Sequence, residues 1–119
     1  MYPIWTYLRL EREDATSIDG IRGSSDRSVL VLTSLASGAK HGYALIKDIE
    51  EFAGVKMGPG TLYGCLAKLE TAGLIEPLPA QDRRHPYRIT ETGALMLTER
   101  LNESARIARI GLKRLAGAM

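Results

Sequence analysis

The sequence predicts a mainly α-helical fold with a small β-hairpin. Apolar residues recur at three-to-four spacing through residues 43–53, 59–72 and 91–119, which is typical of amphipathic helices. Between the second and third of these segments, two short apolar runs lie among three prolines. Because proline cannot donate to a sheet ladder, these runs are confined to an edge hairpin.

The composition narrows the class of protein. The chain has 119 residues, of which 45% are hydrophobic and 25% charged, as in ordinary globular domains. Its net charge of +2 is weak evidence for an anionic partner. Cys65 is the single cysteine, so no intrachain disulfide can form. No uncharged apolar run approaches the roughly 18–20 residues of a membrane span, and the first residues do not resemble a secretory signal. We therefore expect a cytoplasmic protein without membrane contact.

The chain begins with an acidic arm, residues 1–23, that is rich in bulky apolar side chains. This arm is expected either to be loose or to pack on a partner subunit, since exposed large apolar groups are poorly solvated. Ser24-Ser25-Asp26 then offers N-cap oxygens before an apolar run that ends at Gly38. The pattern predicts a first helix at about 26–37, with a short strand as the competing interpretation.

Two further helices follow. Residues 43–53 form an amphipathic pattern that ends at Gly54. At its start, His41 is expected to cap or pack, and the hydroxyl of Tyr43 is a candidate phosphate contact. The next helix is predicted at about 59–72, with the apolar stripe Leu62, Cys65, Leu66 and Leu69 facing inward.

The outward face of the predicted 59–72 helix is small and polar. Gly64 and Ala67 would let its backbone approach a groove floor, while Thr61, Tyr63 and Lys68 can reach phosphates or base edges. The helix start at Gly60-Thr61 can itself donate to a phosphate. The alternative is that this face packs against a protein surface.

The last part of the chain is predicted to be a hairpin followed by a long helix. Residues 74–78 and 87–90 are the expected strands, and Thr90 is placed to cap a helix over 91–119. This helix has a heptad-like apolar seam, and nothing in the chain is long enough to cover it, so a twofold dimer is expected. The seam consists of Leu101, Ala105, Ala108, Leu112, Leu115 and Met119.

This order of elements is that of a winged helix-turn-helix with a long C-terminal dimerisation helix. Residues 24–90 would form the DNA-binding domain, with 59–72 as the recognition helix in the major groove and the basic wing, 74–90, on the DNA backbone. The candidate DNA contacts are Lys40, Tyr43, Lys56, Gly60, Thr61, Tyr63, Gly64, Lys68, Arg83, Arg84 and Arg88.

Catalysis and cofactor binding have little support. Gly58, Gly60 and Gly64 match neither the dinucleotide fingerprint nor the P-loop. The single cysteine and the two histidines have no spacing typical of a zinc site or a catalytic triad. Cys65 is most simply a small core residue. We expect no enzyme activity, no metal and no cofactor.

Three segments resemble the PadR-like transcriptional regulators: HGYALIKDIEE (41–51), GPGTLYGCLAKLETAGLIE (58–76) and RRHPYRITETG (83–93). The resemblance covers about residues 27–93. It implies a homodimer that binds double-stranded, palindromic promoter DNA, usually as a repressor, with the C-terminal helix at the dimer interface. The short tail resembles the smaller subgroup of the family. Two departures are Gly64, where the family often has proline, and the longer arm before residue 24.

Two other functions remain open. The 59–72 helix is nearly neutral, since Lys68 is balanced by Glu70, so the winged helix could be a protein–protein interaction module without DNA binding. Members of the PadR-like family, which this sequence resembles, often bind planar ligands between the C-terminal helices. No aromatic residue follows Tyr87, so such a small-molecule effector would have to use Tyr2, Trp5 or Tyr7 of the arm.

Overall fold

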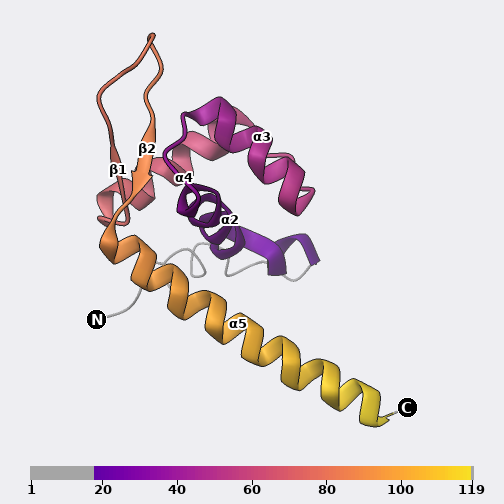
Figure 1. The fold of residues 1–119 in the computed structure, drawn as a ribbon. Helices are drawn as coiled ribbons and strands as arrows, with labels where there is room; N and C mark the ends of the chain where they lie inside the picture. Colours follow the sequence, from indigo (N-terminus) through magenta and orange to yellow (C-terminus); the bar gives the residue numbers. More distant parts are fainter. Residues whose placement is uncertain (1–17, 119) are drawn as a thin grey trace.

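The computed structural model describes residues 18–118, and the expectations for residues 1–17 and Met119 lie outside this range. Within this range, three helices and a β-hairpin pack together, and a long C-terminal helix extends away from them, as Figure 1 shows. In chain order the elements are α2 (Ile18–Ala36), α3 (Gly42–Ala53), α4 (Pro59–Thr71), β1 (Ile75–Pro77), β2 (Tyr87–Ile89) and α5 (Glu91–Ala118).

The first described helix begins earlier than the sequence pattern predicts. α2 begins at Ile18, so the prediction of a helix start at about residue 26 is wrong, as is the alternative of a strand. A glycine inside a helix costs about 1 kcal/mol relative to alanine. Lengthening an existing helix avoids the cost of a new nucleus, so α2 continues through Gly20 and Gly23. The boundary drawn between residues 23 and 24 therefore lies inside a helix.

The core lies where α2, α3 and α4 meet the base of the hairpin. The predicted inward stripe of α4 is confirmed, with Leu62, Leu66 and Leu69 fully buried and Cys65 half-buried. These side chains pack with apolar residues of the other helices, the hairpin and the connecting segments, namely Val31, Leu32, Leu35, Leu45, Ile49, Met57, Leu74, Ile75 and Leu97. This shared core fixes the orientation of α4 relative to α2 and α3.

The predicted hairpin is confirmed with slightly shorter strands. β1 and β2 are antiparallel, with Ile75 opposite Ile89 and Glu76 opposite Arg88. Lys40 adds a single-residue bridge to the other edge of β2: its N–H donates to the carbonyl of Tyr87 at 3.1 Å, and the Tyr87 N–H donates back at 2.9 Å. The segment before α3 is thus attached to the base of the wing (residues 74–90), whose tip points away from α5 in Figure 1.

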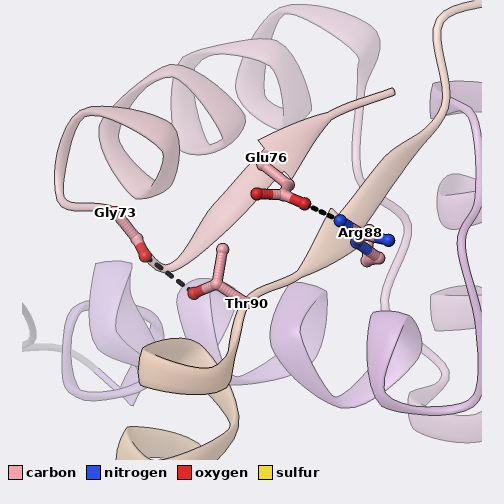
Figure 2. A network of polar contacts seen from close by, with 4 residues as sticks. All are labelled: Gly73, Glu76, Arg88 and Thr90. Carbon is pink, nitrogen blue, oxygen red and sulfur yellow. Dashed lines mark hydrogen bonds and ion pairs between the residues drawn. The ribbon is translucent and has the colours of Figure 1, made fainter. Parts of the chain in front are cut away.

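Thr90 joins the hairpin to the last helix. Its hydroxyl accepts a hydrogen bond from the N–H of Gly93 at 3.0 Å, which confirms the predicted cap of α5. The same hydroxyl donates to the carbonyl of Gly73 at 2.7 Å, next to β1, as Figure 2 shows. Gly93 is buried here, and a Cβ at this position would collide with the carbonyl of Leu74 and approach Ile89 Cγ1 to 2.9 Å. The start of α5 is therefore tightly held against the wing.

The distal half of α5 is left uncovered by the described residues. Of the predicted seam, Leu101, Leu112 and Leu115 are 42%, 69% and 66% exposed. Ile107 and Ile110 are also exposed, and they lie on a different side of the helix from that seam. The apolar surface of α5 is consequently broader than the heptad pattern predicts.

Candidate nucleic-acid interface

The two helices of the helix-turn-helix are well terminated. His41 is the N-cap of α3, and its Nδ1 accepts a hydrogen bond from the N–H of Ala44 at 3.4 Å, which confirms the expected capping role. α3 ends at Gly54, whose φ of 68° is left-handed and whose N–H donates to the carbonyl of Glu50 at 2.9 Å. Five residues, 54–58, connect α3 to α4.

Tyr63 connects α4 to the start of α3. Gly42 is buried, and a Cβ added there would collide with the Tyr63 hydroxyl and approach Cζ of the ring to 2.9 Å. The ring of Tyr63 nevertheless remains 53% exposed. Desolvation by burial, then the charge of Glu70, then Tyr63, raise the pKa of Tyr87 of β2 above its ordinary value.

The face of α4 opposite the core is exposed and nearly smooth. Thr61, Gly64, Ala67 and Lys68 are all exposed, as the sequence predicts. Gly58 is the N-cap and makes no side-chain capping bond, and Pro59 occupies the first turn. At Gly64 a Cβ would meet nothing within 4 Å. The helix start and this face can approach an anionic surface closely.

A hollow of about 260 Å³ lies beside this face, between α2 and α4. It is lined by Arg27, Ser28, Gly60, Thr61, Gly64, Cys65 and Lys68. Arg27 and Lys68 are the charged members of this lining, and none of the described residues that line the hollow is a carboxylate. Arg27 is not among the DNA contacts predicted from the sequence, because the contact between α2 and α4 depends on tertiary packing.

Cys65 lies at the base of the hollow. Its Sγ is 3.8 Å from the hydroxyl of Ser28, which is only 3% exposed. Desolvation by burial raises the pKa of the Cys65 thiol, although the Ser28 hydrogen bond and the charges of Lys68 and Arg27 act in the opposite direction. The thiol therefore stays protonated at neutral pH and is a weak nucleophile.

The wing ends in a tight two-residue turn. Gln81 and Arg84 exchange two backbone hydrogen bonds of 2.8 Å each, with Asp82 and Arg83 between them. Asp82 has a φ of 50° and Arg83 a φ of 66°, so both central residues are left-handed, as in a type I′ turn. An arginine is unfavourable in this conformation, which costs roughly 1–2 kcal/mol for a residue with a Cβ. The turn presents the exposed Arg83 at the very tip of the wing.

Two other wing arginines have partners within the protein. Arg84 Nη1 lies 3.2 Å from Nε2 of His41, so the wing tip contacts the N-cap of α3. A neutral imidazole has one acceptor nitrogen, so Nε2 accepts from Arg84 only in the tautomer in which Nδ1 does not accept from Ala44. Arg88 pairs with Glu76 directly across the hairpin, as Figure 2 shows. The positive charge of Arg88 is therefore largely offset on the surface of the wing.

The remaining predicted contacts differ in their surroundings. The ammonium of Lys40 donates to the carbonyl of Ser34 and, at 2.7 Å, to the hydroxyl of Ser37, so it caps the C-terminus of α2. Such a lysine satisfies helix-end carbonyls and is favoured by the helix dipole. Tyr43 on α3 is 71% exposed, and Lys56 is exposed in the segment before α4.

The structure thus gathers one set of predicted residues and holds another within the fold. The α4 face, Tyr43 and Arg83 are exposed, and Lys40, Arg84 and Arg88 have intramolecular partners. Within residues 18–118, no group of three or more His, Cys, Asp or Glu side chains could hold a metal ion. Among the described helices, none is both long and apolar enough to cross a membrane.

Comparison with known proteins gives a family match over more than half of the chain. Residues 31–99 match the model of the Transcriptional regulator PadR-like family. An uncharacterized 37.1 kDa protein in transposon TN4556 of Streptomyces fradiae is 40% identical over 85 residues, which is 71% of this chain and 25% of that protein. The chain therefore spans about a quarter of the length of this curated relative.

Solved structures share the architecture. A transcriptional regulator from Clostridium thermocellum is similar over 82% of this chain and 95% of its own, with 28% identity and a TM-score of 0.69. A PadR family transcription regulator from hypervirulent Clostridium difficile is similar over 74% of this chain and 96% of its own chain, with 22% identity and a TM-score of 0.67. A winged-helix DNA-binding protein from STIV is similar over 71% of this chain and 92% of its own chain, with 17% identity and a TM-score of 0.66. The last two show the fold alone, and that fold is a winged helix.

Proposed function

Because the chain belongs to the PadR-like family of transcriptional regulators, we propose that it is a homodimeric repressor that binds a palindromic operator. α4 would enter the major groove, and the wing would contact the DNA backbone. The single observation that best supports this proposal is the arrangement of α4, whose exposed face has no large side chain between Thr61 and Lys68 other than Tyr63. A helix with such a face can lie close to base edges.

The electrostatics of the wing support the same orientation. Arg83 stands at the tip in a backbone conformation that an arginine adopts only at a cost, and Arg84 is exposed beside it. Strained residues of this kind gather at functional sites. We assign Arg83 and Arg84 to backbone or minor-groove contact, with Thr61, Tyr63, Gly64 and Lys68 on the groove itself. We assign Lys40 and Arg88 mainly to the intramolecular contacts that stabilise the fold, and not to DNA binding.

The dimer is proposed to form through α5. The helix has 28 residues, and its distal half exposes large apolar side chains that no described part of the chain covers. Burying them against a second copy would remove apolar surface from water at about 25 cal/mol per Å². Because most soluble oligomers are closed and symmetric, a twofold pair is the simplest arrangement. A twofold-symmetric dimer of this kind would bind palindromic DNA whose two half-sites lie about 34–36 Å apart.

A titration of DNA binding against salt tests the assignment of residues. We expect Lys68→Ala to lower the affinity for the protein's own promoter region. The double variant Arg83→Ala/Arg84→Ala should flatten the salt dependence, because each lost phosphate contact reduces the slope of log K against log salt by about 0.9. Unchanged binding in both variants would contradict the assignment. If the protein were instead a protein–protein interaction module, it would bind another protein and would not bind this DNA.

The proposed dimer has its own test. Leu112→Glu and Leu115→Glu place a charge on the exposed side of α5 and are expected to convert the protein to a monomer in analytical ultracentrifugation. Glu99→Gln, which changes the charge at an exposed position on another side of the same helix, is the matched control. A protein that sediments as a monomer before any substitution would contradict the proposal.

A further inference from the structure

We propose that the hollow between α2 and α4 binds one backbone phosphate of the operator, with Arg27 as its main charged contact. This inference rests on the proposed function, since it adds a third contact region to the DNA surface of α4 and the wing. The proposed contact lies on α2, outside the helix-turn-helix itself. Such a phosphate contact would fix the position of the protein along the DNA without reading the base sequence.

The lining of the hollow favours an anion. Among the side chains that the structure describes, its charged members are Arg27 and Lys68, its hydroxyls belong to Ser28 and Thr61, and none is a carboxylate. Arg27 is exposed and permanently charged, and a guanidinium has a fork of donors that matches phosphate oxygens. The Ser28 hydroxyl is buried, and its contact with the Cys65 thiol at 3.8 Å is a weak hydrogen bond. When the thiol is the donor in this contact, the Ser28 hydroxyl proton is available to a group in the hollow.

The size and position of the hollow fit a group that projects from DNA. Its volume of about 260 Å³ corresponds to roughly eight or nine waters at about 30 Å³ each. It opens beside Thr61, Gly64 and Lys68, the face that is proposed to enter the major groove. A phosphate ridge borders the major groove on each side, so a helix in the groove brings its flanks to the backbone. With the wing on one flank, the hollow lies on the side of α2.

Gly64 keeps the hollow open. A Cβ at this position would meet nothing within 4 Å, so the space in front of it belongs to the hollow rather than to another side chain. A large side chain at position 64 would occupy that space while leaving the core side of α4 untouched. The absence of a side chain here is thus explained by access to the DNA backbone as well as to the groove floor.

The experiment compares Arg27→Ala, Arg27→Lys and Gly64→Leu with the wild type on DNA obtained by selection from a random pool. Arg106→Ala is the control, because it removes an equal charge from an exposed position on α5. We expect Arg27→Ala to reduce the slope of log K against log salt by about 0.9 per half-site, while Arg106→Ala leaves it unchanged. Arg27→Lys should restore part of the affinity, and Gly64→Leu should weaken binding with normal helix content.

Backbone neutralisation identifies the phosphate itself. Single methylphosphonate substitutions along the operator should reveal one position per half-site that weakens binding of the wild type but not of Arg27→Ala. If Arg27→Ala behaves like Arg106→Ala while Lys68→Ala and the Arg83/Arg84 double variant lose affinity, the inference is overturned and the proposed function remains. If the wild type selects no DNA from the pool, both are overturned.

Discussion

The ring of Tyr63 on α4 occupies the space that a side chain at Gly42, the first residue of α3, would need. A Cβ at Gly42 would collide with the Tyr63 hydroxyl and lie 2.9 Å from Cζ. Gly42 therefore leaves room for the Tyr63 ring in this position, against the start of α3. Tyr63 is among the residues that are proposed to contact DNA.

Gly42→Ala is expected to lower the free energy of unfolding by about 1–3 kcal/mol, because the added methyl group overpacks this contact. In a Tyr63→Ala background the same substitution should cost much less, since the opposing ring is gone. Urea unfolding of the two single variants and the double variant, at one protein concentration, measures this coupling. Gly64→Ala is the control, since its Cβ meets nothing, and it should stabilise α4 by up to about 1 kcal/mol. Strict additivity of Gly42→Ala and Tyr63→Ala would contradict the contact.

Gly93→Ala tests how α5 is attached to the wing. The added Cβ would collide with the backbone carbonyl of Leu74, which cannot rotate away as a flexible side chain can. We expect a loss of at least about 2 kcal/mol in the free energy of unfolding. Gly111→Ala, in the same helix with open space around it, should instead be neutral or stabilising. Equal effects of the two substitutions in urea unfolding would show that the start of α5 is not held as described.

The turn at the tip of the wing separates backbone strain from DNA contact. Asp82→Gly and Arg83→Gly should each raise the free energy of unfolding by about 1 kcal/mol, because both residues have positive φ and glycine adopts it freely. Only Arg83→Gly should weaken DNA binding, since it alone removes a positive charge. Fluorescence anisotropy with labelled operator DNA, at several salt concentrations, compares the two variants. Equal DNA affinities for both would remove Arg83 from the proposed interface.

Cys65 provides a prediction about reactivity and pH. Burial raises the pKa of its thiol, so at pH 8 the folded protein has a smaller thiolate fraction than the unfolded chain. Alkylation by iodoacetamide should therefore be slower in buffer than in urea. Because the Ser28 hydrogen bond lowers this pKa, Ser28→Ala should raise the pH at which the folded thiol begins to react. A reaction in buffer as fast as in urea would show that the thiol is not protected at the base of the hollow.

Much of this architecture could be predicted from residue patterns, because the patterns are local. The stripe of Leu62, Leu66 and Leu69, the prolines around the hairpin and the cap at Thr90 each specify an element within a few residues. The start of α2 could not be predicted in the same way. Its glycines and hydroxyl residues favour a helix end locally, and continuation of an existing helix outweighs that preference.

The site was predictable only in part, because partners remote in the sequence decide which cations face outward. Lys40 donates to the Ser34 carbonyl near the end of α2 and Arg88 pairs with Glu76, whereas Arg83 remains exposed at the turn. Arg27 lies 37 residues before Gly64 in the sequence, yet the two line the same hollow. Only the packing of α2 against α4 brings them together. Charge counted along the chain could not show this.

Selection of bound DNA from a random pool, followed by sequencing, tests the central claim most directly. If α4 and the wing of each subunit bind one half-site, the enriched sequences should contain an inverted repeat whose halves are centred about one helical turn, 34–36 Å, apart. Lys68→Ala should enrich the same repeat less strongly. A pool that shows no enrichment after repeated rounds, from protein that is folded and dimeric, would contradict the account.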